Sequence, residues 1–208
     1  MLRARELADL AHLYDSRIML ALAPARPDAK ALRHAATLVD AGERRARVEV
    51  DTPGGAPAPG VLDRLAIHDG PDAQAWTSYV EKITEIFACL LDAKTVGVRL
   101  VVSDGPHCPR FHVDQVVARG VLTVIGAGTE WLDDAHLDRA RLGHAGGPGG
   151  DDVSGLVRDW GQLRRAVPGE LAVFKGAAWP GAAGRSVVHR LPPADGVRRV
   201  VLTLDWLD

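Results

Sequence analysis

Apolar residues follow helical intervals in three parts of the N-terminal half. The clearest run covers residues 76–91, where apolar side chains return every three or four positions and so share one face of an α-helix. A second helix is predicted from Asp28, which can cap its first turn, to about residue 41, where Gly42 ends the pattern. Residues 2–14 are predicted to form a shorter helix.

The second half of the chain has the pattern of strands separated by tight turns. Strand-like stretches cover residues 96–104, 110–116, 120–128, 170–176, 186–191 and 198–206. In the N-terminal half, residues 46–51 alternate like a strand, and residues 18–24 are predicted to form a strand or a buried segment. Helices and strands do not alternate, which favours an α+β fold over a doubly wound sheet. We therefore predict a single domain in which a mainly helical part, residues 1–94, packs on a β part, residues 95–208, whose antiparallel strands close into a barrel or jelly roll.

Composition and charge argue against a nucleic-acid-binding protein and against a membrane protein. The chain has 208 residues, 47% of them hydrophobic and 25% charged, and its formal net charge is −2. Its arginines are scattered rather than gathered in a stripe, which argues against a nucleic-acid partner. No apolar run reaches the roughly 18 residues of a membrane span, and Glu6 and Asp9 stand where a signal peptide would be apolar. We expect a cytoplasmic protein with no membrane partner; the pattern leaves the oligomeric state open.

The most informative polar residues interrupt a β-prone run. His112 and Asp114 stand two positions apart, and in a strand such side chains point to the same face. Among the other histidines, His189 stands in a strand pattern of the C-terminal half, in SVVHRLPP. Two histidines and one carboxylate are the ligand set of non-haem Fe(II) oxygenases, and this set leaves coordination positions open for a co-substrate and oxygen. These three residues are the candidate catalytic metal ligands.

The last predicted strand adds a candidate anion site. Arg199 lies ten residues after His189 and shares one strand face with Val201 and Thr203. A guanidinium there can clamp a carboxylate with two hydrogen bonds, and Thr203 can add another. A 2-oxoglutarate-dependent oxygenase requires such a group, because its co-substrate binds iron at one end and carries a free carboxylate at the other. Arg198 is the alternative anchor.

The order and spacing of these motifs resemble a known superfamily. The segments FHVD, VPGELAVFKG, VVHRLPP and RRVVLTLDW are similar to the pattern of Fe(II)/2-oxoglutarate oxygenases. More closely, CPRFHVDQV, GAGTEWL, FKGAAWPG and VHRLPP resemble a bacterial family described as domain of unknown function family 1826. The resemblance implies a cupin-like double-stranded β-helix, Fe(II) held by His112, Asp114 and His189, and 2-oxoglutarate anchored by Arg199. It also implies a small-molecule substrate and O2 as partners.

Other interpretations of the same residues stay open. His112 and Asp114 taken alone are commonly a hydrogen-bonded pair that faces solvent, and Arg199 alone is commonly an ion-pair partner, here of Asp205. A non-catalytic metal-handling protein would bind zinc with the same three ligands and add Cys108 as a fourth. A cupin-like module that binds a sugar or an acid without redox chemistry is the third interpretation.

Overall fold

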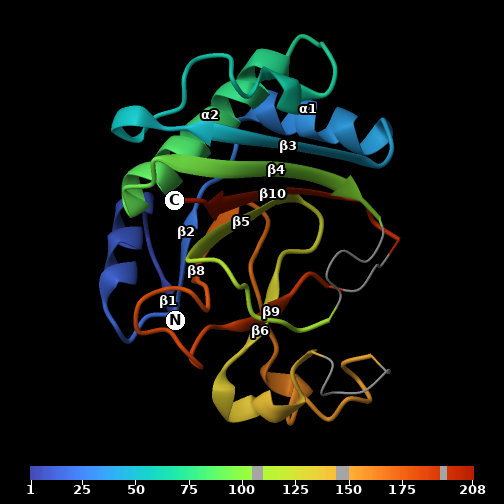
Figure 1. Cartoon of the computed structure of the whole chain (residues 1–208). Helices are drawn as coiled ribbons and strands as arrows, with labels where there is room; N and C mark the ends of the chain where they lie inside the picture. The colour runs from blue at the N-terminus through green and yellow to red at the C-terminus, as the bar shows by residue number, and fades with distance from the viewer. Residues whose placement is uncertain (105–109, 144–149, 193–195) are drawn as a thin grey trace.

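The computed structural model describes residues 1–104, 110–143, 150–192 and 196–208, and the strands in these residues form two sheets (Figure 1). The larger sheet has seven strands in the order β1-β2-β8-β5-β10-β4-β3. Its strands are β1 (Leu2–Arg3), β2 (Leu20–Pro24), β3 (Arg44–Asp51), β4 (Thr95–Ser103), β5 (Ala118–Ile125), β8 (Glu170–Lys175) and β10 (Arg199–Trp206). Neighbouring strands are antiparallel except β1 and β2.

The smaller sheet lies on the side of the large sheet that faces away from the α-helices (Figure 1). It consists of β7 (Arg164–Arg165), β6 (Glu130–Leu132) and β9 (Val188–Arg190), in that order. An isolated antiparallel bridge between His112 and His189 adds a fourth segment along β9. Two facing, mainly antiparallel sheets joined in this way form a jelly roll, as predicted for the β part.

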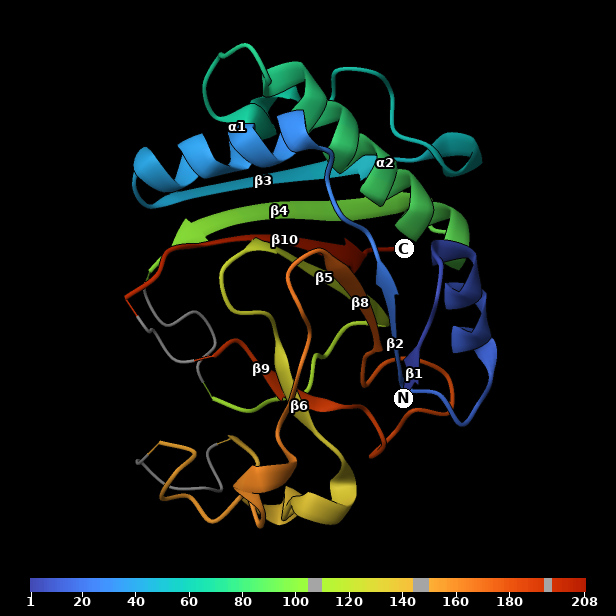
Figure 2. The ribbon, with the colours of Figure 1, turned by 180° about the vertical axis from the view of Figure 1, so that it is seen from behind.

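Two α-helices cover the other face of the large sheet (Figure 2). Helix α1 (Ala29–Asp40) begins as predicted at Asp28, whose side chain accepts a hydrogen bond from the backbone N–H of Ala31 at 2.8 Å. Helix α2 (Ala73–Leu91) carries the predicted apolar face against the sheet. None of the helices in the described part of the chain is long and apolar enough to cross a membrane.

The alternation of side chains along β10 separates two apolar clusters. Leu202 and Leu204 are fully buried in the core between the large sheet and the α-helices. Val201 points the other way and packs with Trp131 of the smaller sheet. Since successive side chains of a strand point to opposite faces, Thr203 also lies on the face turned toward the smaller sheet. This second face is the one that lines the candidate site.

The prediction of a mainly helical N-terminal half is not confirmed. Strands β1, β2 and β3 lie within residues 1–94 and join the large sheet, with β2 beside β8 and β3 beside β4. Residues 2–14, predicted as one helix, form β1 and a 3-10 helix, η1 (Leu7–Tyr14). Residues 110–116, predicted as a strand, make only the isolated bridge at His112. Periodicity identifies an element, whereas its pairing depends on contacts between distant parts of the chain.

Ion pairs to two buried carboxylates hold β6, β7 and β9 together and attach Asp151, in the segment between β6 and β7, to the smaller sheet. Arg190 binds Glu130 at 2.9 Å and Asp151 at 3.0 Å, and Arg165 binds the other oxygen of Glu130. We call these four residues the clamp network. The chain also has short 3-10 helices: η2 (Pro53–Gly55), η3 (Asp63–Ala66), η4 (Asp134–His136), η5 (Arg139–Arg141) and η7 (Trp160–Gln162).

Candidate metal centre

Three side chains predicted as metal ligands converge between the two sheets. His112 and His189 are opposite each other in the antiparallel bridge, where each backbone N–H donates to the other residue's carbonyl, at 2.9 and 3.0 Å. Asp114 follows two residues after His112 and is 5% exposed. One ligand atom from each of His112, Asp114 and His189 lies within 4.8 Å of the others. The pairing of two distant segments therefore builds the site.

The histidine rings are held so that Nε2 faces the centre. Nδ1 of His112 lies 2.9 Å from the backbone oxygen of Arg110, and Nδ1 of His189 lies 3.0 Å from that of Val187. A carbonyl oxygen only accepts hydrogen bonds, so each Nδ1 carries the ring proton and each Nε2 presents a lone pair. Metal-binding histidines are commonly oriented by such a contact at the other nitrogen.

One oxygen of Asp114 lacks a hydrogen-bond donor among the described residues. Oδ1 accepts a hydrogen bond from Arg119. Oδ2 is buried without a hydrogen bond, although it lies 3.1 Å from Nε2 of His189. With the ring proton on Nδ1, Nε2 of His189 and Oδ2 of Asp114 are both acceptors. Two acceptors at this distance repel each other unless a cation binds both. The two Nε2 atoms and Oδ2 thus match the ligand set of a divalent metal site of the two-histidine, one-carboxylate type.

The protonation states suit metal binding. Burial, followed by the proximity of His189, lowers the pKa of His112 below the ordinary value of a histidine. Burial by itself would raise the pKa of Asp114, but that pKa is lowered, and the guanidinium of Arg119 is among the groups that lower it. A neutral imidazole and an ionised carboxylate are the forms that bind a metal ion.

A second set of charged residues supports Asp114 from the large sheet. Arg119, at the start of β5, donates to Asp114 and also to Asp205 of β10, at 2.5 Å. Asp205 in turn lies 3.4 Å from Nη2 of Arg99 on β4. We call these four residues the site network. Sequence reasoning did not identify Arg119 or Arg99, because only the register of β4, β10 and β5 places them beside Asp205.

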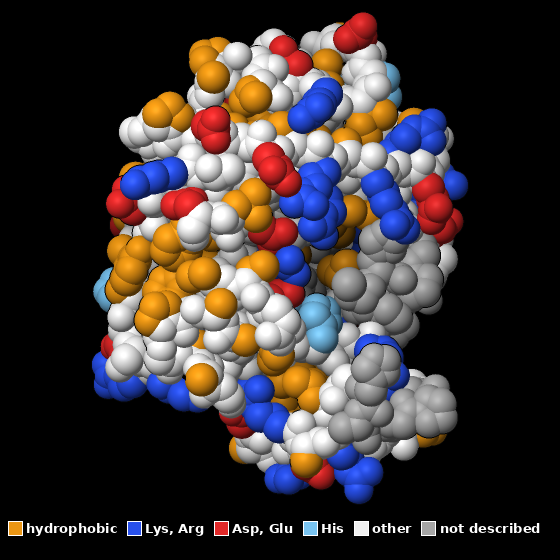
Figure 3. Space-filling model, viewed as in Figure 1, with side chains coloured by type: hydrophobic (Ala, Val, Ile, Leu, Met, Phe, Trp, Pro, Cys, Tyr) orange, Lys and Arg blue, Asp and Glu red, His pale blue; other side chains and the backbone are white. Residues whose placement is uncertain are grey.

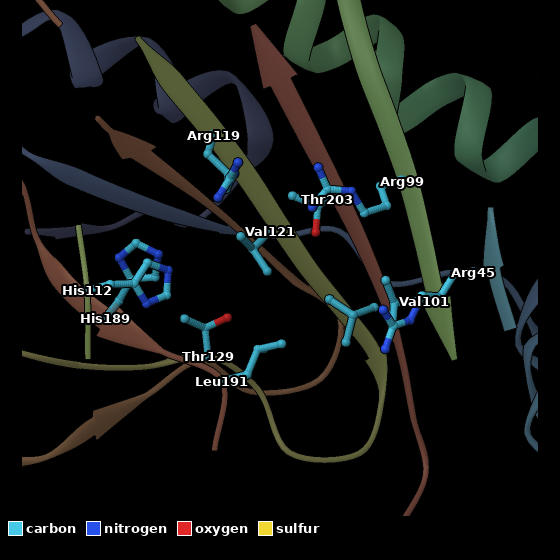
Figure 4. A pocket seen from close by; sticks show the side chains of 11 residues that line it. Arg45, Arg99, Val101, His112, Arg119, Val121, Thr129, His189, Leu191 and Thr203 are labelled. Carbon is cyan, nitrogen blue, oxygen red and sulfur yellow. The ribbon is translucent and has the colours of Figure 1, made fainter. Parts of the chain in front are cut away.

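A cavity of about 340 Å³ opens beside the two histidines. Figure 3 shows a hollow on this face of the molecule, with basic side chains gathered along its upper edge. Figure 4 shows the histidines on one side of the cavity and Arg45 and Arg99 on the other. The lining residues are Arg45, Arg99, Val101, His112, Arg119, Val121, Thr129, His189, Leu191, Val201 and Thr203. The volume is at the lower end of the range for small-molecule sites, about 300–1,000 Å³.

Of the two residues predicted to anchor a carboxylate, Thr203 lines the cavity and Arg199 is not among its described lining residues. Arg199 is 3% exposed and donates to the backbone oxygen of Pro192 at 2.7 Å. Its side chain crosses Gly126, where an added Cβ would lie 2.4 Å from Cγ of Arg199. Arg198 donates to the backbone oxygen of Val39 at 2.7 Å. Cys108 lies outside the described residues.

Comparison with known proteins places the chain in a family. The family model described as "Protein of unknown function (DUF1826)" matches residues 4–205. The chain belongs to this family. Members are grouped by sequence, so the match carries no reaction with it. Among curated proteins, none matches the sequence.

Solved structures with the same fold include several oxygenases. Dioxygenase for auxin oxidation 1 from Arabidopsis thaliana, in a complex with 2-oxoglutarate, is 11% identical with a TM-score of 0.54, covering 97% of this chain and 87% of that chain. The dioxygenase for auxin oxidation in rice is 15% identical with a TM-score of 0.53, covering 97% and 78%. A Pseudomonas putida prolyl-4-hydroxylase is 14% identical with a TM-score of 0.53, covering 97% and 99%. At these identities the likeness shows a shared fold, the jelly roll of the 2-oxoglutarate oxygenases.

Proposed function

We propose that this protein is a non-haem Fe(II)- and 2-oxoglutarate-dependent oxygenase that acts on a small molecule. The observation that carries the proposal is the buried Oδ2 of Asp114, which faces Nε2 of His189 without a donor between them. Three protein ligands leave coordination positions open, as oxygen chemistry requires. The jelly roll shared with solved oxygenases supports the same class of reaction.

In this proposal His112, Asp114 and His189 hold the iron. Bound Fe(II) would supply the redox chemistry by which O2 and 2-oxoglutarate oxidise the substrate. Arg119 would hold Oδ1 of Asp114, so that Oδ2 stays directed at the metal. The apolar side chains of Val121 and Leu191 would exclude water beside the histidines.

Arg199 and Thr203 are the proposed anchor for the distal carboxylate of 2-oxoglutarate. Thr203 lines the cavity, and Arg199 lies on the same face of β10, beyond Val201. Arg199 donates through Nη1 to Pro192, so binding the co-substrate would require its guanidinium to turn toward the cavity. A charge-assisted contact of this kind would orient the co-substrate with its keto acid end at the metal.

The experiment compares metal content and co-substrate binding in the same preparations. Wild type purified without oxygen should bind one equivalent of Fe(II), and 2-oxoglutarate should raise its melting temperature only when metal is present. His112→Ala should lose both effects, whereas His12→Ala, which alters an exposed histidine remote from the site, should keep both. Equal metal content in wild type and His112→Ala would refute the metal site. Tight zinc binding without any effect of 2-oxoglutarate would favour the metal-handling alternative.

A further inference from the structure

The cavity is rich in positive charge on the side away from the histidines. Arg45, Arg99 and Arg119 line it, and none of the described lining residues is acidic. Arg119 is engaged by Asp114 and Asp205, so its charge is balanced within the site network. Arg99 also lies 3.4 Å from Asp205, and both Arg45 and Arg99 are farther than Arg119 from the candidate metal position (Figure 4). A cavity lined in this way attracts anions and focuses their field.

The register of three strands places these two arginines close together on one sheet face. Arg45 of β3 is opposite Val101 of β4, and Arg99 lies two positions from Val101 on the same strand. Such diagonal neighbours have side chains within reach of one ligand group. Arg99 is also opposite Thr203 of β10, whose hydroxyl faces the same cavity. The sheet therefore presents two guanidinium groups and a hydroxyl group side by side.

An apolar wall connects this basic end to the candidate metal centre. Val101, Val121 and Val201 line the cavity together with Leu191. In Figure 4, Val121, Thr129 and Leu191 lie between the histidines and the arginines. A ligand that fits these surfaces has an acidic group at one end and an apolar body that reaches toward the metal.

We propose that the organic substrate of this site is a small anion, whose carboxylate or phosphate group binds Arg45 and Arg99 while its apolar body lies against the valine wall. This inference rests on the proposed function, because it names the substrate class of the same site. The distal carboxylate of 2-oxoglutarate is an anion that would make the same contacts with these two arginines. The experiment must therefore separate a substrate subsite from a co-substrate anchor.

The test uses pairs of probes that share a phenyl ring and differ in charge. Benzoate is compared with benzamide, and phenyl phosphate with phenol, by calorimetric titration into anaerobic protein loaded with Fe(II) and saturating 2-oxoglutarate. Wild type should bind the anion of each pair at least ten times more tightly than the neutral partner, because a charge-assisted contact contributes about tenfold or more in affinity. Arg45→Gln and Arg99→Gln should each lose most of this preference.

Arg47→Gln is the matched control. Arg47 lies two positions from Arg45 on the same face of β3 and directly opposite Arg99 of β4. It binds Glu49 at 2.9 Å and is not among the described residues that line the cavity, so it tests the effect of a neighbouring charge outside the cavity. Its removal changes the net charge equally and should leave the preference for anions intact. An equal loss in Arg47→Gln and Arg45→Gln would indicate a general effect of surface charge and would overturn the proposal.

Two further outcomes overturn the proposal, and neither depends on the oxygenase reaction. Equal affinity for both members of each pair in wild type means that no anion subsite exists. Competition between the anions and 2-oxoglutarate, with weaker 2-oxoglutarate binding in Arg45→Gln, assigns the arginines to the co-substrate instead. If wild type fails to bind 2-oxoglutarate but still prefers the anions through Arg45 and Arg99, the proposed function fails while the anion subsite stands.

Discussion

Two charge networks with buried acidic residues adjoin the segments that carry His112 and His189. Each consists of two acidic residues and two arginines. The clamp network comprises Glu130, Asp151, Arg165 and Arg190, and the site network comprises Asp114, Asp205, Arg99 and Arg119. The acidic residues of both are nearly inaccessible, with Glu130 at 1% and Asp114 at 5% exposure. Their charge content is the same, but their hydrogen bonding is not.

In the clamp network, both oxygens of Glu130 and Oδ2 of Asp151 accept hydrogen bonds from within the fold, so we call this network closed. Arg165 binds one oxygen of Glu130 and Arg190 binds the other. Oδ2 of Asp151 accepts from Arg190 and from the backbone N–H of Phe111, at 3.0 and 2.9 Å. Arg190 follows His189 and Phe111 precedes His112, so the clamp fixes both histidine segments relative to each other. A network with its polar atoms satisfied in this way rigidifies the fold.

The site network leaves one oxygen available. Oδ2 of Asp114 is buried without a hydrogen bond, beside two histidines and an open cavity. An unsatisfied buried acceptor costs folding free energy, on the order of 1–3 kcal/mol, unless a ligand satisfies it. The comparison teaches that equal sets of charges can differ in what they leave unsatisfied: the closed network uses its acceptors within the fold, and the open one leaves a buried acceptor beside a cavity.

The largest expected effect comes from breaking the clamp network. Arg190→Met leaves Glu130 and Asp151 buried without their shared partner, and removal of one member of a buried pair destabilises a protein by about 3–5 kcal/mol. Urea denaturation should show this loss in the free energy of unfolding. Arg164→Gln, which removes the exposed partner of Asp133 just after β6, should cost less than about 1 kcal/mol. Similar losses in the two variants would contradict the distinction between the networks.

A smaller effect, on ligand binding, is expected from Arg199, which belongs to neither network. If Arg199 anchors 2-oxoglutarate, Arg199→Ala should weaken co-substrate binding to metal-loaded protein by about ten- to a hundredfold, the equivalent of a charge-assisted contact. Metal affinity should be unchanged. Arg198→Ala, next in the chain but bound to the carbonyl of Val39, should bind 2-oxoglutarate like wild type. Equal small losses in both variants would remove Arg199 from the proposed site.

The smallest effect is expected from loosening the site network without touching a ligand. Arg119→Gln removes the contact that fixes Oδ1 of Asp114. Because all three candidate ligands remain, metal affinity should fall by about tenfold, the lower end of what loss of such outer contacts causes. Titration with Fe(II) in the absence of oxygen measures the change. Asp205→Asn should lower metal affinity less, because Asp205 acts on Asp114 only through Arg119. Unchanged metal affinity in Arg119→Gln would show that Asp114 is oriented by its backbone alone.

The sequence by itself determined the elements whose signals are local. Apolar periodicity and the cap at Asp28 identified α1 and α2. Alternation identified β3, and apolar runs bounded by turn residues identified β4, β5, β8, β9 and β10, with β2 predicted as a strand or a buried segment. The smaller sheet was only partly visible, because β6 has three residues and β7 has two, too few for a period to show. The His-x-Asp spacing and the strand pattern around His189 named three residues that the structure brings within 4.8 Å. These features depend on neighbours along the chain.

Tertiary structure decided everything that depends on register between distant strands. It joined the N-terminal strands to the large sheet through β8 and β4, where a helical half had been expected. It also placed Arg119, Arg99 and Arg45 around the cavity and turned Arg199 toward Pro192. Strand pairing brings together residues far apart in sequence, and no local pattern records which partner a strand will meet. The candidate metal ligands could therefore be named from the sequence, whereas the charges beside them and the basic end of the cavity could not.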